Sequence, residues 1–173
     1  MERILATSAK ALDLEEGLAE AHASRALALS LDKRFPEALA EFEQAMALNP
    51  TLFEAAYFYG RACFSDGDFE RAAALFEKAA ALKPDDYQSV LLLTAIYRSL
   101  GRDKEMVTVA REGVKRAEQE LARHPEDPRP AYLGALRLLA LGERDRAKEW
   151  ASRALAIDPD DVLTQYNVAC FTP

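Results

Sequence analysis

Residues that favour β-strands are scarce in this chain of 173 residues. It has 6 Val, 3 Ile and 6 Thr against 33 Ala and 24 Leu, and Ala and Leu favour helices. This balance predicts an all-α fold and argues against a sheet-based enzyme. The chain also contains no run of about 18 apolar residues and no signal-peptide stretch near its N-terminus. We therefore expect a cytoplasmic protein that does not contact a membrane.

Positive charge and cysteine are also in short supply. The 22 basic residues face 29 acidic ones, giving a net charge of −7, which argues against binding of nucleic acid or of an anionic membrane surface. The two cysteines, Cys63 and Cys170, lie far apart in the sequence and form no motif. They fit a reducing, cytoplasmic setting rather than a disulfide scaffold.

Residues that could carry catalysis or bind a metal are few and dispersed. The two histidines, His22 and His124, have no partners at metal-ligand spacing. We interpret His22 as a packing residue, His124 as a residue at a helix end, and Cys63 as an inert buried thiol. Phosphate-binding loops and nucleophile motifs are missing from the sequence. We expect no enzymatic activity, no cofactor and no metal in this chain.

Prolines and glycines recur at regular intervals. Four prolines are separated by 34, 41 and 34 residues: Pro50, Pro84, Pro125 and Pro159. Three glycines each follow a proline by 17 residues: Gly67, Gly101 and Gly142. The repeated unit is therefore a pair of helices, with glycine in the turn between them and proline after the second.

The apolar spacing within these units predicts four helix pairs. The pairs are 19–31 with 36–48, 53–65 with 69–82, 87–99 with 103–123, and 129–141 with 144–157. Four aspartates stand near helix starts and are expected to cap them: Asp66, Asp68, Asp85 and Asp86. Seven extra residues lengthen the helix from Asp103, and a heptad keeps its apolar face in phase, so Val114 and Leu121 should be buried. The alternative is a charged overhang, suggested by KRAEQE at 115–120.

The 34-residue helix-turn-helix period resembles the tetratricopeptide repeat, TPR. The best-conforming unit has the small, aromatic and proline residues of that pattern at Gly60, Ala72, Phe76, Ala79 and Pro84. The resemblance implies a right-handed α-solenoid whose concave face is built mainly by the first helix of each pair. We divide the chain into a half repeat at 2–16, repeats at 19–52, 53–86, 87–127 and 128–161, and a truncated repeat at 162–173. The third repeat carries the seven-residue insertion in its second helix.

One stripe of the first helices is expected to line the concave groove. Its residues share a helix face or follow from that face by the repeat: Tyr57, Arg61, Phe64, Leu91, Arg98, Tyr132, Leu136 and Tyr166. Gln88 and Arg129 fall just before two of these stripes and complete the predicted set. Exposed aromatic residues and arginines are typical of binding hot spots. The alternative is that some of these rings fill the inside of a narrow superhelix or cover its truncated end.

The carboxylate clamp of TPR domains that hold chaperone C-termini has no counterpart here. The matching positions carry Ala23, Leu27, Phe58, Gln88 and Leu92. A partner segment with apolar anchors and one or two acidic residues suits the predicted groove better. We therefore expect a non-catalytic scaffold that binds a peptide or helix of a partner protein.

A second interpretation is the regulatory TPR module of a larger bacterial signalling enzyme, such as a nucleotide cyclase. It depends on a weaker resemblance of phrases such as AEAHASRALALS and DPDDVLTQYNVAC to TPR regions of bacterial adenylate cyclase-type proteins.

The C-terminal stretch DVLTQYNVACF should form one helix without a second to cover it, leaving Tyr166, Val168 and Phe171 exposed. This predicts a homodimer through the open end. The alternative is a monomer in which the stretch frays or folds back on the fourth repeat.

Overall fold

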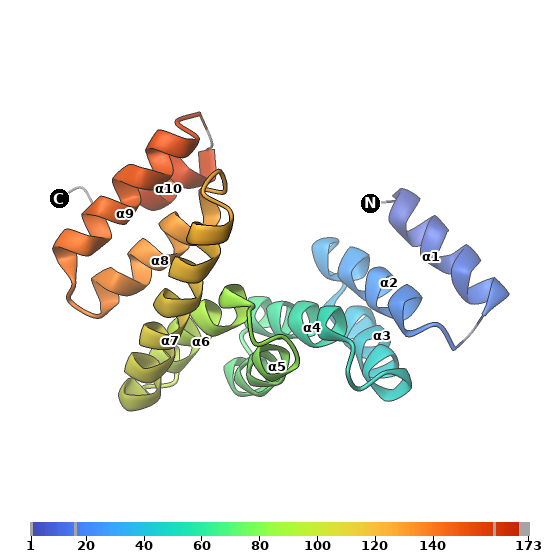
Figure 1. Cartoon of the computed structure of the whole chain (residues 1–173). Coiled ribbons are helices and arrows are strands. Elements are labelled where there is room, and N and C mark those ends of the chain that lie inside the picture. Colours follow the sequence, from blue (N-terminus) through green and yellow to red (C-terminus); the bar gives the residue numbers. More distant parts are fainter. Residues whose placement is uncertain (1, 16, 161, 170–173) are drawn as a thin grey trace. The chain divides into compact units, whose positions relative to one another are not determined.

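The computed structural model describes residues 2–15, 17–160 and 162–169, and all regular structure in these ranges is α-helical. The predicted all-α fold is confirmed (Figure 1). The chain forms two compact units, one ending at Pro84 and the other beginning at Asp85.

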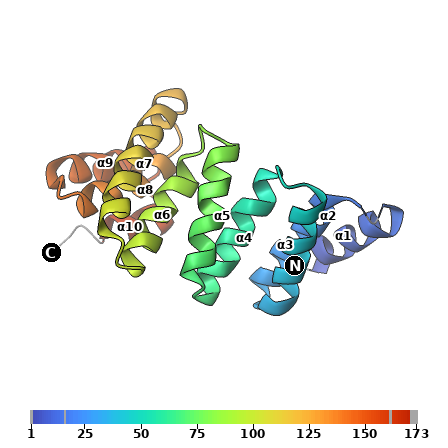
Figure 2. The same cartoon turned by 90° about the horizontal axis from the view of Figure 1, so that it is seen from below.

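The first unit is built from α1 to α5. Their bounds are α1 Glu2–Leu14, α2 Ala19–Leu31, α3 Phe35–Leu48, α4 Phe53–Asp66 and α5 Phe69–Leu82. Helix α2 pairs with α3 and α4 pairs with α5, while α1 packs on α2 and α4 contacts both members of the preceding pair. Figure 2 shows α4 and α5 side by side along their lengths. The inner helices α2 and α4 contact each other directly, as the first helices of successive repeats should.

The second unit is built from α6 to α10. Their bounds are α6 Tyr87–Ser99, α7 Asp103–Arg123, α8 Arg129–Ala140, α9 Arg144–Ile157 and α10 Val162–Ala169. Helix α6 pairs with α7 and α8 pairs with α9, while α10 packs on α8 and α9. The four predicted helix pairs are confirmed, with a difference of one residue at three helix ends.

Helix ends follow the predicted chemistry in part. Gly67 ends α4 with φ of 88°, in the left-handed region that glycine adopts without strain. Asp68 caps α5 by accepting a hydrogen bond from the Arg71 amide, and Asp86 caps α6 by accepting from the Ser89 amide at 2.8 Å. The prediction was wrong for Asp66, which is the last residue of α4, and for Asp85, which lies one position before a cap.

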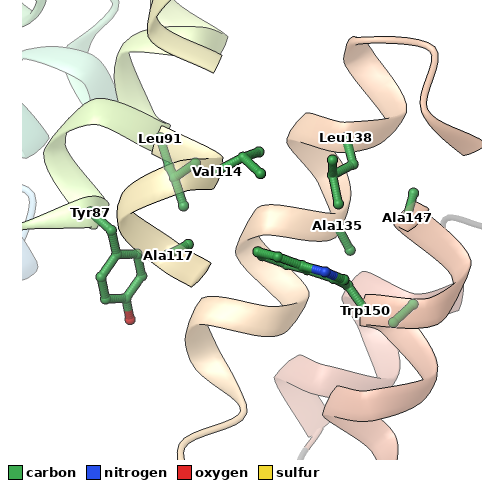
Figure 3. Close-up of a cluster of buried hydrophobic side chains, with 9 residues drawn as sticks. Tyr87, Leu91, Val114, Ala117, Ala135, Leu138, Ala147 and Trp150 are labelled. Carbon is green, nitrogen blue, oxygen red and sulfur yellow. The ribbon is translucent and has the colours of Figure 1, made fainter. Parts of the chain in front are cut away.

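The long helix α7 is buried along its extension. Val114 and Leu121 are 5% and 2% exposed, so the prediction of an in-phase apolar face is confirmed and the charged overhang is excluded. Val114 and Ala117 join a core cluster with side chains of α6, α8 and α9 (Figure 3). Trp150 extends from α9 across α8 in that cluster, and its ring lies over Gly134. A heptad insertion therefore adds core contacts without changing which face of the helix is apolar.

His22, His124 and Cys63, which were considered as catalytic or metal-binding residues, have contacts or burial typical of structural residues. The Nδ1 atom of His22 lies 2.7 Å from Oε2 of Glu41, with the imidazole mostly buried. His124 follows the last residue of α7, and its Nδ1 atom lies 3.4 Å from Oε1 of Glu126. Cys63 is buried, and this burial raises the pKa of its thiol to about 11. Cys170 lies outside the described residues.

Candidate functional site

The inner helices of the second unit enclose a cleft of about 360 Å³ between α6 and α8. Its lining residues come from the last turns of the two helices: Thr94, Ala95, Arg98, Leu136, Arg137, Leu139 and Ala140. Two residues of the predicted groove, Arg98 and Leu136, lie together here. The cleft therefore combines apolar walls with two guanidinium groups.

Arg137 differs from the other residues of this cleft because its guanidinium is bonded to a main-chain oxygen of α6 and has a lowered pKa. Its Nε and Nη2 atoms donate to the main-chain oxygen of Leu91 at 2.9 and 2.8 Å. Burial, and to a smaller extent the positive charge of Arg98, lower the pKa of Arg137 to about 10. At neutral pH the guanidinium is still charged. Within the described ranges it makes no ion pair with a carboxylate.

Two more polar side chains line the same cleft. Arg98 is exposed near the C-terminal end of α6 and, among the described residues, has no carboxylate partner. Thr94 is 4% exposed, and its Oγ1 atom makes no hydrogen bond to any described group. A buried hydroxyl without a partner destabilises the free protein, so a ligand that bonds to it gains affinity.

The first unit has a smaller cleft of about 150 Å³ between α2 and α4. Leu27, Leu52 and Phe58 form its apolar lining, and Glu20 and Glu54 are exposed at its edge. This cleft has the opposite charge to the cleft between α6 and α8. It can take an apolar anchor or a basic side chain.

A larger cleft of about 630 Å³ lies between α1 and α2. Its two hydroxyl groups from α1 are bonded within that helix, because Thr7 donates to the carbonyl of Arg3 at 2.7 Å and Ser8 donates to that of Leu5 at 3.1 Å. The hydroxyl protons of Thr7 and Ser8 are therefore already used, unlike that of Thr94 in the cleft between α6 and α8.

The predicted groove residues of α4 make contacts inside their own unit. The Tyr57 ring packs against Phe53 at 5.6 Å and against Phe76 at 5.7 Å between centroids. Phe64 packs against Phe69 at 5.7 Å, and both predicted aromatic residues are half-buried. Arg61 is exposed. The two rings thus combine internal packing with partial exposure, and Arg61 is open to solvent.

Two predicted groove residues are core residues instead. Leu91 is 1% exposed and packs in the cluster with Val114 and Trp150, and its main-chain oxygen accepts a hydrogen bond from Arg137. Tyr132 is 7% exposed and packs with Leu121. The prediction of exposed side chains at these two positions was wrong, because neighbouring helices cover this side of α6 and α8.

The remaining predicted groove residues differ in their surroundings. Arg129 is exposed but forms an ion pair with Asp127 at 2.8 Å. Gln88 is half-buried in the first turn of α6, and Tyr166 of α10 is 70% exposed. None of these three lines the cleft between α6 and α8. Only two residues of the predicted groove, Arg98 and Leu136, therefore line that cleft.

Sequence reasoning missed Arg137 and Thr94. The signal for Arg137 was present, since it is a single charge inside the apolar run AYLGALRLLA. Thr94 carried a weaker signal, because it stands at a position where the repeat usually has a small residue. Both residues stand beside the predicted stripe and not on it, so the repeat spacing that defines the stripe does not include them.

Comparison with known proteins agrees with this architecture. Residues 29–95 match a family model described as tetratricopeptide repeat. The chain has the TPR fold. A crystal structure of YrrB, a TPR protein with an unusual peptide-binding site, is 20% identical over 95% of this chain and 81% of its own, with a TM-score of 0.65. TTC0263, a thermophilic TPR protein from Thermus thermophilus, is 18% identical over 96% of this chain and 88% of its own, with a TM-score of 0.71.

A third similar structure is residues 41 to the end of MamA from Desulfovibrio magneticus RS-1. It is 20% identical over 88% of this chain and 82% of its own, with a TM-score of 0.63. No curated protein matches the sequence. The weaker resemblance to adenylate cyclase-type proteins is not borne out by these matches. The predicted all-α TPR solenoid is confirmed, and this fold is typical of non-catalytic protein–protein interaction scaffolds.

The described residues were also compared with the requirements of a membrane span and of a metal site. Among their helices, none has the length and apolar character needed to cross a bilayer. Within the same ranges, His, Cys, Asp and Glu side chains form no cluster of three or more suited to a metal ion.

Proposed function

We propose that this chain is a non-catalytic scaffold whose inner helices bind a segment of a partner protein. The proposal rests on the cleft between α6 and α8, where apolar side chains lie beside two arginines that pair with no carboxylate in the described part of the chain. The partner segment is a peptide or helix that carries apolar anchors and at least one acidic residue. The proposed setting is the cytoplasm of a bacterium.

The apolar part of the cleft supplies contact area for the anchors. Leu139 is 36% exposed, and Leu136 is half-buried beside it. Burial of apolar surface contributes about 25 cal/mol per Å². A side chain inserted between α6 and α8 therefore contributes affinity through Leu136 and Leu139, while the arginines select its neighbours by charge.

The half-buried aromatic residues of α4 extend the proposal to the first unit. Tyr57, Arg61 and Phe64 are proposed to contact a partner in the same way, by aromatic area and one positive charge. Arg129 and Tyr166 complete the proposed binding set. Substitution of Tyr57, Arg61 or Phe64 by Ala is expected to weaken partner binding by about 1 to 3 kcal/mol if each is a hot spot.

Selection of peptides from a random phage library against the full chain tests this proposal. We expect enriched sequences with apolar residues around an Asp or Glu. Their binding should be lost in Leu139→Glu and retained in Ser152→Glu, which places the same charge on the exposed outer helix α9. Enriched peptides that ignore Leu139→Glu but are lost in Ser152→Glu would move binding to the outer helices and contradict the proposal.

A further inference from the structure

The charge of Arg137 has no counter-charge in the part of the chain that the structure describes. Arg137 is half-buried, and an ionised group that is partly removed from water destabilises the protein unless a partner of opposite charge or several hydrogen bonds replace the lost hydration. Here Nε and Nη2 share the carbonyl oxygen of Leu91, at 2.9 and 2.8 Å. A guanidinium has five N–H groups in one plane, so three remain along its other edges.

The side chains of Thr94 and Arg98, which line the same cleft, lack a hydrogen-bond or ion-pair partner among the described residues. Thr94 Oγ1 is buried without a hydrogen-bond partner among the described residues, and it lines the same cleft as Arg137. Arg98 lines this cleft too, four residues after Thr94 on α6, and raises the local positive potential. Two cations and one unsatisfied hydroxyl therefore surround one space of about 360 Å³.

We infer that Thr94, Arg98 and Arg137 form a binding site for a single carboxylate of the partner segment. This inference rests on the proposed function and names the group that the cleft recognises. One carboxylate oxygen accepts from the free N–H groups of Arg137, and the second accepts from Thr94 and Arg98. The three positions differ from those of the carboxylate clamp, which here carry Ala23, Leu27, Phe58, Gln88 and Leu92.

A carboxylate fits this cleft better than a phosphate does. The rest of the lining is apolar, with Ala95, Leu136, Leu139 and Ala140, and such walls leave the third oxygen and second charge of a phosphate without partners. The net charge of −7 also opposes the approach of a dianion more than that of a monoanion. An Asp or Glu side chain and a C-terminal carboxylate supply the same chemistry.

Nuclear magnetic resonance of the arginine Nε–H groups tests the site without a known partner. We expect acetate, but not chloride at equal ionic strength, to shift the resonances of Arg98 and Arg137 in the full chain. Each resonance is assigned by its loss in Arg98→Gln or Arg137→Gln. Shifts caused by inorganic phosphate but not by acetate, or no shift with either, would overturn the inference.

Defined peptides test recognition in the proposed setting. The probes are acetyl-Leu-Glu-Leu-Leu-amide, its Gln counterpart, and that Gln counterpart with a free C-terminus. We expect the Glu peptide to bind about tenfold more tightly than the Gln amide, as a charge-assisted hydrogen bond provides. Recovered affinity of the free-acid Gln peptide would assign the site to a C-terminal carboxylate, and no recovery would assign it to a side chain.

Matched variants locate the effect. Arg98→Gln and Thr94→Val should each bring the Glu and Gln amides toward equal affinity, whereas Arg144→Gln, an exposed arginine of α9 outside the cleft, should leave the preference unchanged. Equal binding of both amides that is still lost in Leu139→Glu would overturn the carboxylate site but leave the scaffold proposal standing. Acetate shifts with no binding of any selected peptide would contradict the scaffold proposal alone.

Discussion

At the residue scale, close packing depends on glycines that sit under aromatic rings. A Cβ atom at Gly134 would lie 2.3 Å from Cζ3 of Trp150, and one at Gly60 would lie 3.1 Å from the ring of Phe76. The first distance is far shorter than a van der Waals contact, and a buried indole cannot move aside freely. Gly134 is therefore the more stringent of the two positions.

Gly134→Ala should lower the free energy of unfolding by about 1 to 3 kcal/mol, because an added methyl forces Trp150 out of place. Urea unfolding followed by circular dichroism measures the change. Gly17→Ala is the control, since no atom lies within 4 Å of its added Cβ. Gly60→Leu should also destabilise, because its larger side chain meets Phe76. Equal midpoints for Gly134→Ala and Gly17→Ala would contradict this account.

The thiol of Cys63 should resist alkylation. Burial raises its pKa to about 11, so about one thiol in a thousand is ionised at pH 8, and reactivity should rise as the pH approaches 11. In a Cys170→Ser background, we expect iodoacetamide to label the native protein slowly at pH 8 and the urea-unfolded protein rapidly. Fast labelling of the native state, measured by mass spectrometry, would show that Cys63 is accessible.

The residues that sequence reasoning placed correctly are those whose role follows from local spacing. His22, Cys63, Val114 and Leu121 are packed as the helical period predicts. Arg137 was missed, because its unusual state comes from a carbonyl 46 positions away in the sequence. Burial by another helix and the absence of a counter-charge are tertiary properties, and no local pattern contains them.

At the scale of the helix, the C-terminal part of α7 packs against the next helix pair, α8 and α9. Leu121 packs with Ala131, Tyr132 and Ala154, and its carbonyl accepts from Nη2 of Arg153 at 3.3 Å. Arg116 donates to the carbonyl of Asp86 at 3.2 Å, so the same helix is also bonded to the start of α6. Helix α7 is therefore hydrogen-bonded to the residue before α6 and packed against α8 and α9.

Leu121→Ala should destabilise the protein by about 2 to 5 kcal/mol, as removal of a fully buried leucine usually does. Gln119→Ala, at an exposed position of the same helix, is the control. Thermal unfolding of the two variants provides the comparison. If Leu121→Ala matched the control, the far end of α7 would be an overhang after all, and deletion of the heptad Val114 to Glu120 would then be tolerated.

Helix limits could be predicted closely because proline, glycine and capping aspartates act within one turn of the chain. Exposure along a helix could not be predicted as well. Leu91 and Tyr132 were placed on an open face by their position in the repeat, but α7 and its neighbours cover them. The repeat period identifies which residues occupy equivalent positions, but it does not determine how much of each side chain the neighbouring helices bury.

At the scale of the whole molecule, α10 leaves apolar surface exposed. Val162 and Tyr166 are 74% and 70% exposed. Val168 differs from the prediction of an uncovered residue, since it is half-buried and packs against the cluster around Trp150. Phe171 lies outside the described residues. The predicted contact surface therefore narrows to the face of Val162 and Tyr166.

We expect self-association of the chain through this face of α10 at high concentration. Burial of apolar side chains supplies the free energy, at about 25 cal/mol per Å². Light scattering over a concentration series should show a dimer that Val162→Glu with Tyr166→Glu abolishes. Leu14→Glu, which replaces an exposed leucine of the first unit, should leave it unchanged. A monomer throughout the series would mean that this exposed surface has no second copy as its partner.

The sequence contains one tryptophan, and it lies in the second unit with 6% of its surface exposed. Its fluorescence therefore reports solvent entry into that unit alone, whereas far-ultraviolet dichroism reports the helices of both. If the two halves unfold together, the two denaturation curves coincide; if they unfold separately, the curves part. Because Trp150 lies in only one of the two units, its fluorescence measures whether the units on either side of Pro84 unfold cooperatively, without a label or a substitution.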